Sequence, residues 1–217
     1  MKVINIGEKN SLLNNFLAEI RDHVIQKDSQ RFRRNLERIG EIFAYEISKT
    51  LSYSLKEVQT PLGIASCNTF DSEIVISSIL RAGLPLHHGF LNYFDKAQNA
   101  FIAAYRKYGK GNDFKIQIEY SSSPSIDSKI LILADTMLAT GSSVVLAFNK
   151  LTEVEKPIFT HIVSPIASRD GIEYLSKHIP HKNTTLWVGA IDEELTTKSY
   201  IVPGLGDAGD LAFGSKL

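Results

Sequence analysis

One stretch of the chain, residues 129–135, constrains the fold more than any other. It reads Lys-Ile-Leu-Ile-Leu-Ala-Asp, an unbroken apolar run that ends in a carboxylate. A strand with one face in water alternates apolar and polar residues, whereas a strand covered on both faces does not. The run therefore predicts a central strand of a parallel sheet, with a layer of helices on either side.

Other segments continue an alternation of strands and helices. Short β-branched or apolar runs predict strands at 74–79, 100–105, 158–166 and 185–191. Apolar residues at three- or four-residue spacing predict amphipathic helices within 11–51, and helices are also expected at 144–148 and 171–178. The whole pattern predicts an α/β fold in which a parallel sheet of about five strands is flanked by helices.

Two further segments are expected to lie outside this framework. Residues 107–113 are rich in lysine and glycine, and Phe114–Glu119 alternates apolar and polar residues, so 106–124 is predicted to form a projecting, mobile β-hairpin arm. The tail at 200–214 contains Gly204, Gly206, Gly209 and Gly214, and it is predicted to be an ordered loop rather than a helix or strand.

Composition limits the class of protein. At 217 residues the chain is expected to form a single domain, residues 1–217, and its 24 basic residues balance 24 acidic ones. No global positive field is then available to attract nucleic acid or an anionic membrane. A lone cysteine, Cys67, excludes an internal disulfide, and no apolar window is long enough to span a bilayer, so a cytoplasmic location is expected.

The nonapeptide after the central apolar run is the strongest functional signal. Free amides at a helix start, a glycine and several hydroxyls favour an oxyanion, so the segment predicts a site for a monophosphate. The lysine and spacing of a Walker-type loop are absent. An ordinary capped helix start is an equally good interpretation of the Thr-Gly-Ser-Ser turn alone. The nine residues are Asp135, Thr136, Met137, Leu138, Ala139, Thr140, Gly141, Ser142 and Ser143.

This nonapeptide resembles the 5-phosphoribosyl 1-diphosphate motif of the uracil phosphoribosyltransferases, a type I phosphoribosyltransferase family whose motif reads Asp-Pro-Met-Leu-Ala-Thr-Gly-Gly-Ser. Thr136 and Ser142 depart from it. Four other blocks carry the resemblance, and the last of them is the closest. They are Thr60–Gly63, Ile79–Leu84, Tyr105–Arg106 and Tyr200–Asp210.

The resemblance implies an activity and a set of site residues. Uracil would react with 5-phosphoribosyl 1-diphosphate to give UMP and pyrophosphate, with Arg81, Arg106 and Asp207 as catalytic residues. All three, with the nonapeptide, would bind the phosphoribosyl diphosphate, and Mg²⁺ would bind through the substrate diphosphate and Asp207. Uracil would contact the tail. The tail residues concerned are Tyr200, Ile201, Gly206, Asp207 and Ala208.

The resemblance also implies a hood, made by an N-terminal helical region at 1–60 and the uracil-binding loop at 200–214. It implies a homodimer or higher homo-oligomer, to whose contacts the 106–124 arm contributes. Activation by GTP and the identity of a general base stay open. So do two other functions: phosphoribosyl transfer to a different base, and an RNA-binding regulator that kept the fold, against which the balanced charge argues. Arg81 and Arg106 as solvated surface charges remain an alternative for those two residues.

Overall fold

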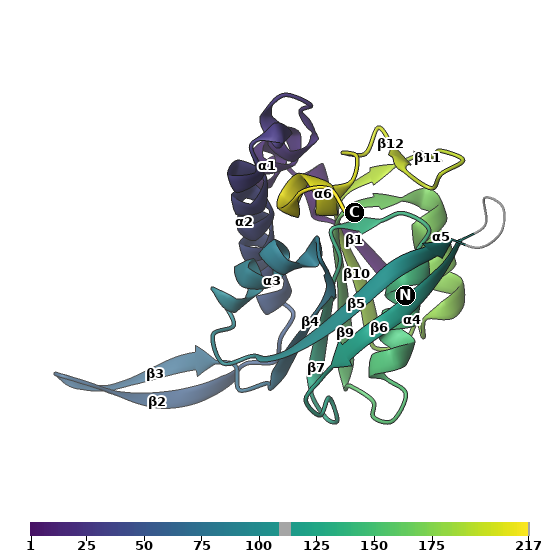
Figure 1. Cartoon of the computed structure of the whole chain (residues 1–217). Helices are drawn as coiled ribbons and strands as arrows, with labels where there is room; N and C mark the ends of the chain where they lie inside the picture. Colours follow the sequence, from purple (N-terminus) through teal and green to yellow (C-terminus); the bar gives the residue numbers. More distant parts are fainter. Residues whose placement is uncertain (109–113, 217) are drawn as a thin grey trace.

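The computed structural model describes residues 1–108 and 114–216, and the side chains of residues 105–116 lie outside that description. Its centre is a mostly parallel sheet with the strand order β1-β10-β9-β7-β4-β5-β6, in which β8 also pairs with β9 (Figure 1). Only β6 runs antiparallel to its neighbour, β5. The strands of this sheet are β1 (Lys2–Asn5), β4 (Ile74–Leu80), β5 (Gln98–Tyr108), β6 (Phe114–Ser122), β7 (Ile130–Ala134), β8 (Met137–Leu138), β9 (Phe159–Ser168) and β10 (Thr184–Asp192).

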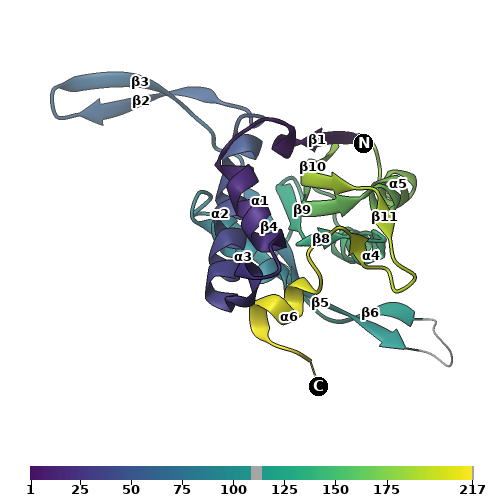
Figure 2. The same cartoon turned by 90° about the horizontal axis from the view of Figure 1, so that it is seen from above.

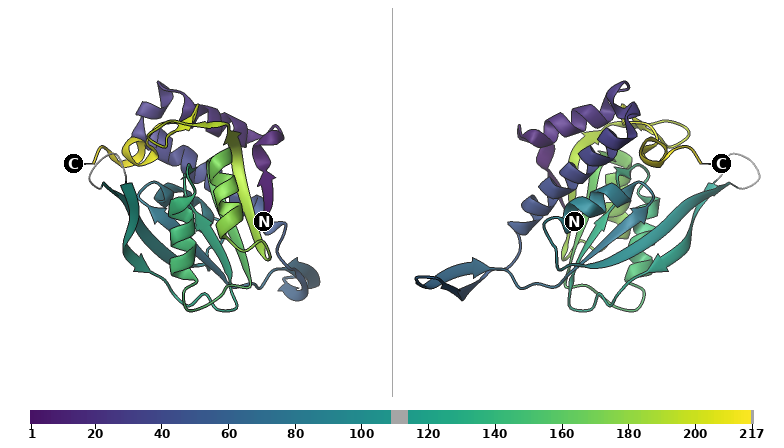
Figure 3. Two further views of the ribbon diagram at one scale, coloured as in Figure 1. Left: turned by 90° about the vertical axis from the view of Figure 1, so that its right-hand side faces the viewer. Right: turned by 60° about the vertical axis from the view of Figure 1, so that its left-hand side comes forward.

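Helices cover both faces of the sheet, as the apolar run in β7 predicts. The side chains of Ile130 and Ile132 join a core with α1, α2 and α3, while those of Leu131 and Leu133 join a second core with α4 and α5. Figure 3 shows the layer of α4 and α5 in front of the sheet in its left view, and the layer of α1, α2 and α3 in front in its right view. The helices are α1 (Leu12–Arg21), α2 (Ser29–Ser48), α3 (Gly83–Leu91), α4 (Ser142–Leu151), α5 (Arg169–His178) and α6 (Ala208–Phe213), with 3₁₀ turns at Ile6–Glu8 and Ile25–Lys27.

The hood lies over the carboxyl edge of the sheet. Helices α1 and α2 form it together with α6, and a two-stranded sheet of β11 (Glu194–Leu195) and β12 (Ile201–Val202) continues from it (Figure 2). Helix α6 corrects the expectation of a tail without regular structure. The Asp207 side chain caps its start by accepting a hydrogen bond from the Asp210 amide at 3.0 Å, which stabilises one short helical turn that periodicity could not reveal.

The N-terminal region also differs from the expected run of helices. It begins with β1, which pairs in parallel with β10, and residues 54–60 form a strand. That strand, β2 (Ser54–Thr60), pairs with β3 (Gly63–Thr69) in an antiparallel hairpin that extends away from the rest of the chain (Figure 1). Most residues of the hairpin are exposed on both faces, so its sequence carries no alternation that predicts a strand.

The expected arm at 106–124 falls on the β5–β6 hairpin. The backbones of Arg106 and Ile116 pair across it, and the tip, residues 109–113, lies outside the described residues. The mobility of this arm stays a prediction. Within the described part of the chain, no helix is long and apolar enough to cross a bilayer.

Helices α2 and α3 pack with their backbones in close contact. A Cβ atom on Gly89 would lie 2.0 Å from the Glu37 carbonyl oxygen and 2.9 Å from the Gly40 Cα atom. Real Cβ atoms do not approach that closely, so glycine at position 89 is a condition of this packing. Since α3 directly follows the segment 79–82, the packing also fixes where that segment lies.

We expect Gly89→Ala to destabilise the protein by roughly 1–3 kcal/mol, although alanine favours a helix, because the two helices must move apart. Urea unfolding measures the change. Asn15→Ala, at an exposed position of α1, is the control, and it should leave stability within about 0.5 kcal/mol of the wild-type value. Equal stability of Gly89→Ala and wild type would contradict the close packing.

Candidate active site

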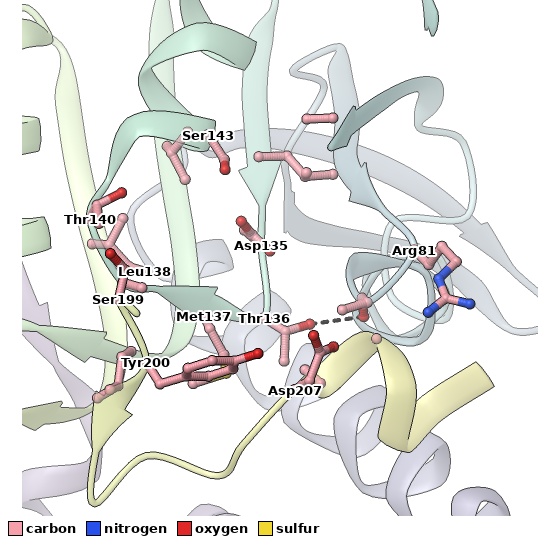
Figure 4. A pocket seen from close by; sticks show the side chains of 18 of the residues that line it. Arg81, Asp135, Thr136, Met137, Leu138, Thr140, Ser143, Ser199, Tyr200 and Asp207 are labelled. Atoms are coloured by element: carbon pink, nitrogen blue, oxygen red, sulfur yellow. Dashed lines mark hydrogen bonds between the residues drawn. The ribbon is translucent and has the colours of Figure 1, made fainter. Parts of the chain in front are cut away.

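A cleft of ≈ 610 Å³ opens at the carboxyl edge of the sheet, where β4 and β7 end. Three parts of the chain that are far apart in the sequence contribute most of its lining: residues 79–82 at the end of β4, residues 135–141 and 143–144 after β7, and residues 199–201 and 206–209 before and within α6. Figure 4 shows Arg81, Asp135 and Asp207 around this space, with Tyr200 beside Met137. Carboxyl edges of parallel strands are where α/β proteins place their ligands.

The nonapeptide forms the wall between β7 and α4. Gly141 sits at the start of α4 with φ +79°, and a Cβ atom there would lie 2.7 Å from Leu175 Cδ1 and 3.0 Å from the Gly171 carbonyl oxygen. The N-cap residue Gly141 has no side chain to cap α4, and the first amide of the helix, that of Ser142, makes a long contact of 3.4 Å with Thr140 Oγ1. The following amides of the first turn have no partner within the helix, so they are available to an anion, and the helix dipole favours one there.

The two residues that depart from the family pattern each make a hydrogen bond. Thr136, fully buried, donates from Oγ1 to the Ala82 carbonyl oxygen at 2.8 Å, a bond that a proline cannot form. It joins the segment after β7 to the segment after β4. The Ser142 hydroxyl accepts from Thr140 Oγ1 at 3.1 Å, and the Ser142 amide donates to the same Thr140 oxygen at 3.4 Å.

Arg81 lies at the opposite side of the cleft, joined to Leu80 by a cis peptide bond. Its Nη2 donates to Asp210 Oδ1 at 3.0 Å and to the Gly214 carbonyl oxygen at 3.1 Å. Its Nε is buried and has no partner among the described residues. The guanidinium is thus held at the cleft by two hydrogen bonds from Nη2, while its buried Nε is left without an acceptor among the described residues.

The third wall is the tail. Ile201 is buried and also lines the cleft, and the Val202–Pro203 bond that follows is cis. Gly206, at φ +93°, leaves open space where a Cβ atom would stand. In Figure 4 the Asp207 side chain lies near Thr136, between the tail and the nonapeptide. Residues 206–209 line the cleft in succession, and the two glycines among them, Gly206 and Gly209, can line it only with their backbone.

Most residues predicted from the sequence lie in this one cleft. The exceptions are Ser142, which does not line it, and Arg106, whose side chain lies outside the described residues. Sequence reasoning did not single out the contact between Arg81 and Asp210, although Asp210 stands in the Tyr200–Asp210 block. Eight lining residues were also not predicted as site residues: Ile79, Leu80, Ala82, Ala104, Val144, Ser199, Gly209 and Lys216.

Carboxylates are few in the cleft. Asp135 and Asp207 line it, and no group of three or more His, Cys, Asp or Glu side chains in the described residues is arranged to hold a metal ion. Two separated carboxylates suit a cation that arrives with a substrate and keeps several waters, as Mg²⁺ does with phosphates.

Comparisons with known proteins agree with this geometry. The family model described as uracil phosphoribosyltransferase matches residues 8–215. The chain belongs to the uracil phosphoribosyltransferase family. A uracil phosphoribosyltransferase of Porphyromonas gingivalis is 54% identical over 217 residues, 100% of each chain. Another, from Methanothermobacter thermautotrophicus, is 39% identical over 189 residues, which cover 86% of this chain and 85% of that one.

Solved structures share the fold of this family member. A protein from Aquifex aeolicus superposes with a TM-score of 0.87 at 29% identity, covering 98% of both chains. A hypoxanthine phosphoribosyltransferase of Staphylococcus aureus reaches a TM-score of 0.51 at 15% identity, over 86% of this chain and 83% of that one. The type I phosphoribosyltransferase fold expected from the sequence is confirmed.

Burial of Asp135 raises the pKa of its carboxyl from 3.8 to about 7, against the lowering effect of hydrogen bonds from the Thr136 and Met137 amides. Between these pH values the unfolded chain loses this proton and the folded chain keeps it. The contribution of Asp135 to stability therefore falls as pH rises from 4 to 7, and then levels off.

We expect the unfolding free energy of wild type minus that of Asp135→Asn to fall by roughly 2–4 kcal/mol from pH 4 to pH 7. Urea unfolding of both proteins at each pH measures the difference, in which the other titrating groups cancel. A difference that stays constant across this range would refute the raised pKa.

Proposed function

We propose that this cleft transfers the phosphoribosyl group of 5-phosphoribosyl 1-diphosphate to N1 of uracil, giving UMP and pyrophosphate in pyrimidine salvage. One observation carries the proposal: the start of α4, Arg81 and the tail residues 200–201 and 206–209 all line one cleft. The first suits a 5′-phosphate, the second a diphosphate, and the third the edge of a base.

The nonapeptide would hold the sugar phosphate. The amides at the start of α4 and the hydroxyls of Thr140 and Ser143 bind the 5′-phosphate, and Asp135 accepts hydrogen bonds from the ribose hydroxyls. The remaining members, Met137, Leu138 and Ala139, contribute the wall of the cleft. The ribose is then bound through its 5′-phosphate at one end of this short segment and through its hydroxyls at the other. These two attachments hold its anomeric carbon in place.

Arg81 would bind the diphosphate at the other side of the ribose, joined by Arg106 from the arm. Charge that develops on the departing pyrophosphate is neutralised by guanidinium groups, which stay protonated at any working pH. The transition state resembles an oxocarbenium ion, so no protein nucleophile is needed. Mg²⁺ bound with the diphosphate would supply further neutralising charge, and Asp207 is positioned at the cleft to contact that complex.

The base would be recognised by backbone groups of the tail. Uracil presents two carbonyl oxygens and an N3 hydrogen, whereas cytosine presents an amino group and an unprotonated N3. Fixed amides and carbonyls near Ile201, Gly206 and Ala208 pair with the first pattern and leave the second unsatisfied. The Tyr200 ring borders the same space (Figure 4).

The assay is pyrophosphate release by purified protein with Mg²⁺, phosphoribosyl diphosphate and uracil, cytosine, hypoxanthine or no base, each with and without GTP. Release with uracil alone is expected. Release with another base would show that the assignment of uracil to the tail is wrong. Release only with GTP would establish that GTP activates the enzyme. If no base gives pyrophosphate release, and labelled RNA is retained by the protein in a salt-sensitive way, the result would favour the alternative of an RNA-binding regulator.

We expect Arg81→Ala to lower kcat/KM for phosphoribosyl diphosphate by roughly 10²–10³-fold, because the leaving group loses a fixed positive charge. Arg81→Lys should retain part of the activity, since a lysine keeps the charge and loses the forked geometry. Arg34→Ala, which breaks an exposed ion pair with Glu37 at 2.7 Å, is the control and should keep wild-type turnover. Full turnover of Arg81→Ala would remove Arg81 from the site.

The proposal includes a homodimer in the cytoplasm. The exposed apolar side chains of the β2–β3 hairpin support the dimer, because water contacts Leu55, Leu62 and Ile64 on a segment that projects from the chain. Cys67, the lone cysteine, is exposed and free, which supports a reducing location.

We expect Leu55→Glu combined with Ile64→Glu to shift the sedimentation of the protein toward the monomer, because both residues lie on one face of the hairpin and charges there oppose burial. Lys56→Glu is the control, since Lys56 is exposed on the other face of the same hairpin. An unchanged dimer in the double variant would show that the hairpin is not the contact.

A further inference from the structure

A partly buried ion pair connects the hood to the end of the sheet. Arg21, in the last turn of α1, donates from Nη1 to Asp192 Oδ2 at 2.8 Å and from Nη2 to Asp192 Oδ1 at 2.9 Å. Asp192 is the last residue of β10, and its side chain is only 8% exposed. A forked pair of this kind fixes distance and direction together.

The same two side chains hold Gly204 in the tail. Arg21 Nη1 donates to the Gly204 carbonyl oxygen at 3.1 Å, and the Gly204 amide donates to Asp192 Oδ2 at 2.9 Å. Gly204 has φ +53°, and a Cβ atom there would lie 2.2 Å from the Ile201 carbonyl oxygen. Both peptide groups that flank this residue are therefore bound by one arginine–aspartate pair.

This anchor stands at the start of the segment to which the proposed function assigns the base. Residues 206–209 line the cleft, and this run begins two residues after Gly204. It continues into the first turn of α6, whose start is capped by Asp207. Leu205, between Gly204 and Gly206, is buried in the core at 4% exposure. The backbone at 206–208 is held on one side by the ion pair and on the other by the capped helix.

We propose that Arg21 and Asp192 are positioning residues for base recognition, which set the place of the 204–208 backbone without touching the base. This inference rests on the proposed function, because it deepens the account of the same site. Backbone recognition has no side chain that can adjust, so a small displacement of the segment changes every hydrogen bond to the base at once. The phosphate side of the cleft makes no contact with this pair among the hydrogen bonds of the described residues.

The test compares Asp192→Asn and Arg21→Lys with wild type in the pyrophosphate assay. We expect KM for uracil to rise roughly tenfold in each, while KM for phosphoribosyl diphosphate changes less than about twofold. Arg31→Met is the matched control, because it removes another forked arginine–carboxylate pair of the hood, with Glu19 at 2.7 and 2.9 Å, that does not reach the tail. Its two KM values should equal those of wild type.

Amide hydrogen exchange gives a readout independent of turnover. In both variants the amides of 204–208 should exchange faster than in wild type, while those of β7 keep their protection. Equal rates in the tail would overturn the proposal. So would a loss of protection in β7 together with the tail, because the pair would then support the whole fold rather than this segment.

The failures of the two ideas are distinguishable. The proposed function fails if the wild-type protein releases no pyrophosphate with uracil under any condition of the assay. The positioning role fails if the wild-type protein is active and both variants keep its KM for uracil. It fails equally if KM for both substrates rises by the same factor, because the effect would then not be specific to the base.

Discussion

The burial of β7 on both faces is the constraint on which the rest of the structure depends. All five of its residues are buried, and alternate side chains enter two separate cores. A strand of this kind leaves polar ligands no access through either face. The carboxyl edge of the sheet is the place left, and there the chain passes from Ala134 to the half-buried Asp135 and into the start of α4.

Close backbone packing and a few polar contacts then assemble the cleft from segments far apart in sequence. Gly171, at the start of α5, brings that helix against the nonapeptide, since a Cβ atom there would lie 2.4 Å from the Ala139 carbonyl oxygen. The hydrogen bond from Thr136 to Ala82 joins the nonapeptide to the segment after β4, and the bond from Arg81 to Asp210 joins that segment to α6. Each wall of the cleft is therefore held by a neighbouring wall.

The sequence predicts the buried part of this molecule well and its exposed part poorly, for a physical reason. Burial on two faces produces continuous apolar runs, so β4, β7, β9 and β10 were all expected near their observed bounds. The β2–β3 hairpin contacts little of the core, and its residues keep no such pattern. The contact between Arg81 and Asp210 was not predicted either. The two residues are 129 positions apart in the sequence, and only the tertiary structure brings them together.

Arg81 and the tail show how the two halves of the cleft depend on each other. The guanidinium donates to Asp210 and to the Gly214 carbonyl oxygen, so the residue assigned to the diphosphate is oriented by the helix that follows the base-binding backbone. Under the proposed function a diphosphate would compete with the Asp210 carboxylate for the same cation, and its net affinity would be the difference between the two interactions. The buried Nε, with no partner in the described residues, adds the desolvation cost of an unpaired donor to this arrangement, so the two bonds from Nη2 must outweigh that cost for the side chain to stay at the cleft.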